Sequence, residues 1–184
     1  MWTKSIRRSS EMSTWRGYRA TAVGVDPRLG QVNRFRARNT SEATLRSEPH
    51  LVWKVLTDPD LLPELTPYLK RIEVDGDRWT WHLTRIPVMS ATITPTFTEV
   101  MTFEEPTRIV FAHDAERTDE RTGVEGHYEL TPDGTGTHVA IDLEIWCDLP
   151  LPRVSRIAVE TVMSGVVAAM GKRFASNMLR HLGE

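Results

Sequence analysis

The most reactive side chain that the sequence places in an apolar setting is the carboxylate of Glu99. It lies between Phe97 and Met101 in a run with apolar residues at every second position, and the period of a strand puts all three on one face. A carboxylate on a dry face has its pKa raised by desolvation, and it can then act as acid or base in an enolisation, aldol or dehydration step. The competing interpretation is a register shift at Pro95 that turns Glu99 to solvent.

A second titratable side chain, His113, shares the phase of Ile109 and Phe111, and Tyr128 lies in the next apolar run. Glu99 together with His113 or Tyr128 would form a proton relay in a cyclase or dehydratase. The other interpretation of His113 is an exposed histidine at a strand end. We predict Glu99 and His113 as candidate catalytic residues, and the sequence leaves open whether the protein is an enzyme.

Other catalytic chemistry lacks a motif. The sequence has no Gly-x-Ser-x-Gly elbow, no phosphate-binding glycine loop and no His-Glu-x-x-His pair. No two of the histidines have the spacing of metal ligands; they are His50, His82, His113, His127, His138 and His181. We therefore expect no metal site and no cofactor.

The composition is that of one ordinary soluble domain, because 184 residues with 40% hydrophobic and 26% charged residues can bury one core. No apolar run approaches the roughly 20 residues that span a bilayer, so we expect no transmembrane segment. The single cysteine, Cys147, excludes an internal disulfide and fits a reducing compartment. We expect a cytoplasmic protein.

Basic residues are concentrated at the N-terminus. Residues 1–38 carry nine Lys or Arg against Glu11 and Asp26, a net charge of +7, whereas the rest of the chain carries −9. Such a leader can be an arm for nucleic acid or a membrane surface, a tail that docks onto its own domain, or a plain extension. We predict residues 1–35 as a basic, flexible N-terminal extension and residues 36–184 as the folded domain. We expect no nucleic-acid partner, and we leave peripheral membrane contact and the oligomeric state open.

The first half of the domain reads as one strand followed by two short helices. Apolar residues at every second position indicate a strand that ends near Arg46. Ser47 then looks like a helix cap, and Pro49 lies in the first turn, where its missing N–H costs no hydrogen bond. A second short helical stretch, interrupted by prolines, follows over residues 61–68.

Hairpins follow, marked by their turns. Asp75-Gly76-Asp77 is the kind of Asp-Gly connection that permits positive φ. One strand over residues 89–103, bent at Pro95, comes next, and further strands follow over residues 107–113, 124–130 and 138–149. The sequence thus predicts about seven strands, nearly all antiparallel neighbours with one dry face.

A long apolar helix is predicted over residues 153–182. Val154, Ala158, Thr161, Gly165 and Ala169 fall on one helical stripe, and other apolar residues widen it beyond a single face. We expect this helix to be too apolar to lie on a surface, and to face both the sheet and a cavity or partner. The alternative is a buried core helix without a cavity.

The order of elements and several local patterns resemble a known family. The patterns are 49–59 (PHLVWKVLTDP), 71–74 (RIEV), 105–111 (EPTRIVF) and 134–139 (GTGTHV). Over residues 36–183 the chain is identified as a member of the START, polyketide-cyclase and plant-allergen superfamily (SRPBCC), and it looks closest to bacterial single-domain members. The resemblance implies the α+β helix-grip fold, in which an antiparallel sheet wraps around a long C-terminal helix and two short helices follow the first strand.

The resemblance also implies a cavity that encloses an apolar or amphipathic molecule, such as a lipid, a quinone or a polyketide. We predict that its lining includes Tyr68, Trp79, Trp81, Phe97, Met101, Phe111, Tyr128, Val162, Met163, Val166 and Met170. Three functions stay open: a carrier or sensor of such a ligand, a polyketide cyclase or dehydratase, and a module that binds a protein partner through the basic arm or the long helix.

Overall fold

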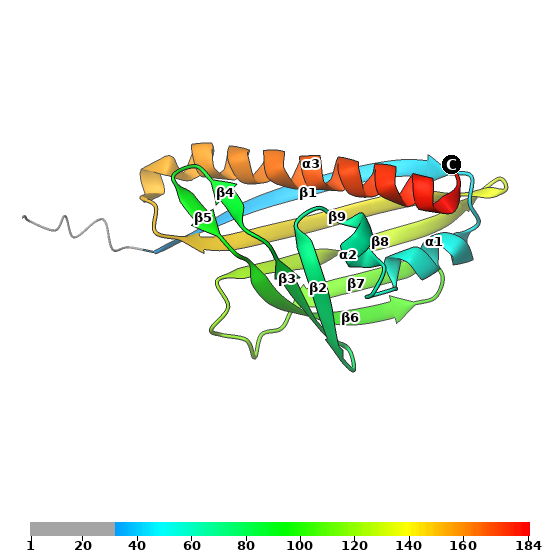
Figure 1. The fold of residues 1–184 in the computed structure, drawn as a ribbon, viewed down its shortest axis with the longest axis horizontal. Helices are drawn as coiled ribbons and strands as arrows, with labels where there is room; N and C mark the ends of the chain where they lie inside the picture. The colour runs from blue at the N-terminus through cyan, green and yellow to red at the C-terminus, as the bar shows by residue number, and fades with distance from the viewer. Residues whose placement is uncertain (1–31) are drawn as a thin grey trace, which may run out of the picture.

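A seven-stranded antiparallel sheet forms the centre of the molecule. The computed structural model describes residues 32–184, so nearly all of the extension predicted for residues 1–35 lies outside the described residues. The strands run in the order β1-β9-β8-β7-β6-β3-β2, and the C-terminal helix α3 (Arg156–Leu182) lies along the sheet (Figure 1). The predicted helix-grip fold is confirmed. The strands are β1 (Asn33–Leu45), β2 (Leu69–Asp75), β3 (Arg78–Leu83), β6 (Thr96–Glu104), β7 (Arg108–His113), β8 (Thr122–Asp133) and β9 (Gly136–Leu149).

Tight turns set the register of the sheet. Gly76 has φ +62° between β2 and β3, where Asp75 pairs with Arg78, and Gly134 has φ +60° between β8 and β9. Glycine adopts this backbone conformation without steric cost, so a two-residue connection can reverse the strand. The hairpin predicted around Gly76 is confirmed.

The strand predicted over residues 89–103 is wrong in its first part. The structure has two short strands, β4 (Ile86–Val88) and β5 (Ala91–Ile93), that pair in a separate two-stranded sheet. Strand β6 begins only at Thr96, after Pro95, whose carbonyl accepts a hydrogen bond from Leu83 N at 3.0 Å. Because proline donates no backbone hydrogen bond, the ladder breaks there instead of bending.

The two short helices are α1 (Pro49–Leu56) and α2 (Leu62–Leu65). Pro49 occupies the first turn as expected, but the residue before the helix is Glu48, and the cap predicted for Ser47 is wrong. The Ser47 hydroxyl instead donates to Oε1 of Glu184 at 2.6 Å, which ties the start of α1 to the C-terminal end of α3.

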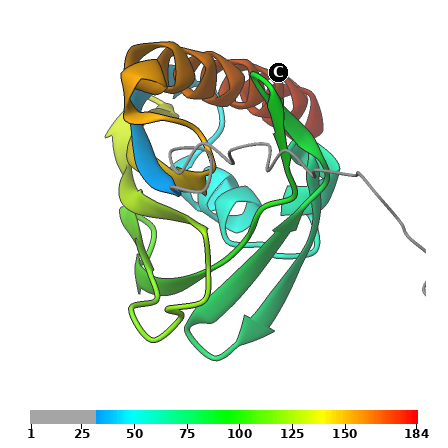
Figure 2. The ribbon, with the colours of Figure 1, turned by 90° about the vertical axis from the view of Figure 1, so that its left-hand side faces the viewer.

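The sheet curves into a trough, and α3 lies across its open side (Figure 2). Two groups of buried apolar residues fill the ends of this trough. One group surrounds Val52 and Trp53 of α1, and the other joins Phe35 of β1 to Val159 and Met163 of α3. The fold therefore has two packed ends and a middle that side chains do not fill.

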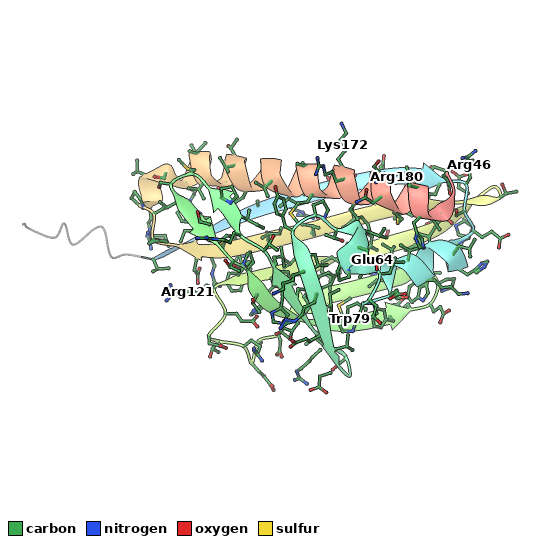
Figure 3. The ribbon with its side chains drawn as sticks, viewed as in Figure 1. Arg46, Glu64, Trp79, Arg121, Lys172 and Arg180 are labelled. Atoms are coloured by element: carbon green, nitrogen blue, oxygen red, sulfur yellow. The ribbon has the colours of Figure 1, made fainter. Side chains whose placement is uncertain are left out.

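The outer side of α3 faces solvent, so the expectation that this helix cannot lie on a surface is wrong. Val154, in the turn η1 (Arg153–Ser155), is 90% exposed and Ile157 is 82% exposed. The other exposed apolar residues in the middle of α3 are alanine and glycine, so leaving them in water costs little. Lys172 projects from the same side (Figure 3). By length and composition alone, Arg153–Leu182 could also cross a membrane, but it packs here on β1, α1 and α2.

Candidate functional site

A cavity of about 330 Å³ occupies the middle of the trough. Its wall is formed by the inner faces of the sheet, the β4–β5 hairpin, the α2 region and the inner side of α3. Exposed residues such as Ser41 of β1 and Gly171 of α3 belong to the wall, so the cavity reaches solvent between these two elements. Nearly all other lining side chains are apolar, which makes the cavity suitable for an apolar guest.

Most of the predicted lining residues are in this wall. The wall contains Trp81, Phe97, Met101, Phe111, Tyr128, Met163, Val166 and Met170. Three predicted residues lie elsewhere. Trp79 packs in the core with its ring 5.8 Å from Phe103, Tyr68 is exposed with φ +65°, and Val162 packs against the group around Phe35.

Sequence reasoning missed two parts of the wall. The first is the inner face of β1, β8 and β9, whose strand period is visible in the sequence but from which only Tyr128 was predicted to line the cavity. The second is the β4–β5 hairpin, which the prediction of a single strand concealed. The missed residues of these two parts include Ala43, Leu45, Ile86, Val88, Ile93, Thr122, Val124, Ile141, Leu143 and Ile145, and Val167 and Phe174 of α3 were missed as well.

Glu99 is the one carboxylate in the deep part of the wall. It is 3% exposed, so the alternative in which Pro95 turns it to solvent is wrong. The register explains this, because Phe97 pairs with Trp81 and Glu99 pairs with Trp79, which keeps the inward phase after the break. Burial raises the pKa of Glu99 well above its ordinary value, and no cation among residues 32–184 counteracts it.

Trp81 and Tyr128 are the polar neighbours of this carboxyl. The indole N–H of Trp81 lies close enough to Glu99 to oppose part of the rise in its pKa, but the two groups do not reach hydrogen-bond geometry, and Nε1 has no partner within the described residues. Burial, together with the charge of Glu99, raises the pKa of Tyr128. The Tyr128 hydroxyl is therefore a neutral donor at physiological pH.

His113 lies outside the cavity wall. Its Nε2 is 3.0 Å from Oε2 of Glu120, and its ring packs edge-on against Trp146 with centroids 5.0 Å apart. Strand β7 ends at His113, so the strand period no longer fixes the direction of this side chain. The structure does not bring His113 together with Glu99 in the cavity, and a relay inside the cavity has only Tyr128 as its second member.

The sequence was compared with known families and structures. Residues 36–183 match the family described as polyketide cyclase / dehydrase and lipid transport. The chain belongs to this family. No curated protein matches the sequence. The family indicates binding of a hydrophobic small molecule.

Solved structures show the same fold at low identity. An aromatase/cyclase from Streptomyces sp. R1128 is 14% identical over 79% of this chain and 93% of its own, with a TM-score of 0.58. A START superfamily protein from Mycobacterium smegmatis is 13% identical over 78% and 95%, with a TM-score of 0.57. A conserved protein from Geobacillus kaustophilus is 16% identical over 81% and 95%, with a TM-score of 0.56.

Proposed function

We propose that the protein binds an apolar or amphipathic small molecule, of the lipid, quinone or polyketide type, and acts as its carrier or sensor in the cytoplasm. The observation that carries this proposal is the cavity of about 330 Å³ with a largely apolar wall between the sheet and α3. The volume lies at the lower end of the range for small-molecule sites, which is roughly 300–1,000 Å³.

The energetics support such a complex. A ligand that buries a few hundred Å² of apolar surface gains about 25 cal/mol per Å², which amounts to several kcal/mol. This gain offsets a good part of the translational and rotational freedom lost on association. An apolar wall is sufficient for binding, whereas turnover needs polar groups aimed at the reacting atoms.

Native mass spectrometry of the purified protein tests the proposal, followed by denaturing extraction and identification of whatever is released. We expect a stoichiometric lipid, quinone or polyketide-like compound. If the protein carries nothing and a panel of these compounds also shows no saturable binding, the proposal fails.

A second candidate function is a cyclase or dehydratase, and Glu99 is the observation that favours it. A carboxyl with a raised pKa inside an apolar cavity can donate or accept a proton near neutral pH. Tyr128 lines the same cavity and would be its partner in a relay. With the ligand identified as above, Glu99→Gln distinguishes the two functions. An enzyme loses turnover while binding persists, whereas equal turnover in both proteins removes Glu99 from the mechanism.

A further inference from the structure

The start of the C-terminal helix exposes an apolar pair. Val154 and Ile157 are the two most exposed large apolar side chains among residues 32–184, and the others are at most about half exposed. The pair lies three positions apart in the helical segment Arg153–Leu182, so both side chains share its outward side. Leaving both in water costs free energy that contact with an apolar surface would recover.

The outward side of α3 carries positive charge. Lys172, Arg173 and Arg180 are exposed there, and none of the exposed residues of α3 is acidic. Lys172 projects away from the sheet (Figure 3). The one acidic residue of α3, Glu160, pairs with Arg156 at 3.5 Å. The outward side of α3 therefore joins an apolar end to a basic middle and end.

This charge contrasts with the rest of the domain. Residues 153–184 carry five Lys or Arg against two Glu, a net charge of +3, whereas residues 39–152 carry nine basic and 21 acidic residues, a net charge of −12. Residues 1–31 carry six Lys or Arg against two acidic residues. The chain enters β1 beside η1, because Asn33 Nδ2 donates to the carbonyl of Leu151 at 2.9 Å. Basic residues are thus gathered around the exposed apolar pair.

An anionic bilayer fits both properties of this surface. Anionic headgroups attract Lys and Arg, and the boundary between headgroups and acyl chains takes up apolar side chains from a helix that lies in the interface. A second copy of the same face would bring like charges together, and so would residues 1–31 if they covered it. Charge complementarity therefore favours the lipid surface over these two occupants.

We propose that the outward side of α3 docks on an anionic lipid surface, with Val154 and Ile157 inserted among the lipids and Lys172 and Arg173 against the headgroups. The proposal concerns the outside of the helix and does not depend on what the cavity holds.

Vesicle sedimentation of the full-length protein tests this proposal. Vesicles of phosphatidylcholine alone are compared with vesicles of equimolar phosphatidylcholine and phosphatidylglycerol. We expect binding to the anionic vesicles only. A rise in ionic strength from about 0.1 M to about 1 M should weaken it, because the Debye length falls from about 10 Å to about 3 Å.

Variants assign the binding to the helix face. The double variant Val154→Ser/Ile157→Ser should lower the partition coefficient on anionic vesicles by about tenfold or more, because both side chains lose apolar burial. Lys172→Gln and Arg173→Gln should each lower it about fivefold, the usual effect of one basic residue near an anionic surface.

Matched controls come from β2, at the other edge of the sheet from β1. Val74→Ser and Lys70→Gln make the same kinds of change at exposed positions and should leave the partition coefficient unchanged. Urea midpoints check that every variant is folded.

A fluorescent reporter locates the contact. Cys147 is only 3% exposed, so a nitrobenzoxadiazole maleimide labels an introduced cysteine selectively in the folded protein. A label at Ala158→Cys should brighten and shift to the blue on anionic vesicles, since the dye leaves water. The same label at Val74→Cys should not change.

Three results would overturn the proposal. The first is a wild-type protein that stays in solution with both kinds of vesicle. The second is equal binding by the wild type and the Val154→Ser/Ile157→Ser variant, which would mean that other residues, such as the basic segment 1–31, hold the protein on the vesicles. The third is a dimer in sedimentation velocity that this variant dissociates, because the face would then join two copies of the chain. The ligand-binding function proposed above stands in all three cases.

Discussion

Glu99 and Glu120 both have buried carboxylates near strand β6, but they differ in their hydrogen-bond partners. Glu99 belongs to β6 and faces the cavity, whereas Glu120 comes from the loop before β8 and contacts the other face of β6. Glu120, with a 5% exposed side chain, accepts hydrogen bonds from Thr98 N and Thr98 Oγ1, both at 2.8 Å, and pairs with His113 at 3.0 Å. Glu99, the neighbour of Thr98 in the chain, has no charged partner among the described residues. The fold provides hydrogen-bond donors for the buried carboxylate of Glu120 but not for that of Glu99. Glu99 is therefore the candidate for function.

The largest loss of stability should follow from removing the Glu120 carboxylate. Glu120→Ala removes the acceptor for both Thr98 groups and for His113, which leaves buried donors unpaired. We expect a loss of about 2–4 kcal/mol in the free energy of unfolding, measured by urea denaturation. Glu120→Gln keeps an acceptor oxygen and should lose less. If the two variants are equally stable, the Glu120 hydrogen bonds do not hold this face together.

The outer and inner faces should also differ in their tolerance of added volume. A Cβ at Gly123, on the outer face, would lie 2.5 Å from the Trp146 ring, so we expect Gly123→Ala to cost about 1–3 kcal/mol of stability. Val166→Phe instead places new atoms in the cavity. It should change the unfolding free energy by less than about 1 kcal/mol. The same variant should weaken binding of the ligand identified by extraction at least tenfold, and unchanged binding would show that this ligand sits outside the cavity.

The pH dependence of stability should also distinguish Glu99 from the carboxylates that have partners. Burial raises the pKa of Glu99 in the folded protein, while the unfolded chain has an ordinary value near 4.5. Between these two values the folded state binds more protons, so stability is full below pH 4.5 and is lost as the pH rises through the folded pKa. The slope is at most about 1.4 kcal/mol per pH unit.

Glu99→Gln is the reference for this measurement, because it has no proton to lose. Asp114, Asp142 and Glu184 have lowered pKa values and contribute the opposite slope in both proteins. The difference between wild type and variant in urea midpoints from pH 4 to pH 8 isolates Glu99. If this difference does not change with pH, the pKa of Glu99 is not raised.

The sequence predicted the strands and helices of the fold better than the residues of the cavity. Strand periods and the turn at Gly76 placed the sheet, because each depends on local residue types alone. The direction of His113 depends on where β7 ends, and the hairpin at Ile86 consists of two three-residue strands that are too short to show a period. Neither is encoded in a local period. Glu99 could be predicted because it is a charged residue among apolar residues on one face of a strand. Only the packed structure could show that it lacks a charged partner.

The smallest effects should come from the ion pairs on the outer face of β1. Arg34 pairs with Asp148 at 2.8 Å and also lies 3.7 Å over the Trp146 ring, whereas Arg38 pairs only with Asp142 at the surface. Water and salt screen an exposed pair, but a guanidinium on an aromatic face also packs against it.

We therefore expect Arg34→Ala to lower the unfolding free energy by about 0.5–1 kcal/mol, after allowance for its partial exposure. Arg38→Ala should shift the melting temperature by less than about one degree. Paired thermal melts of the two variants at low and high salt measure both effects. An equal loss in the two variants would mean that the contact of Arg34 with the Trp146 ring adds nothing to stability.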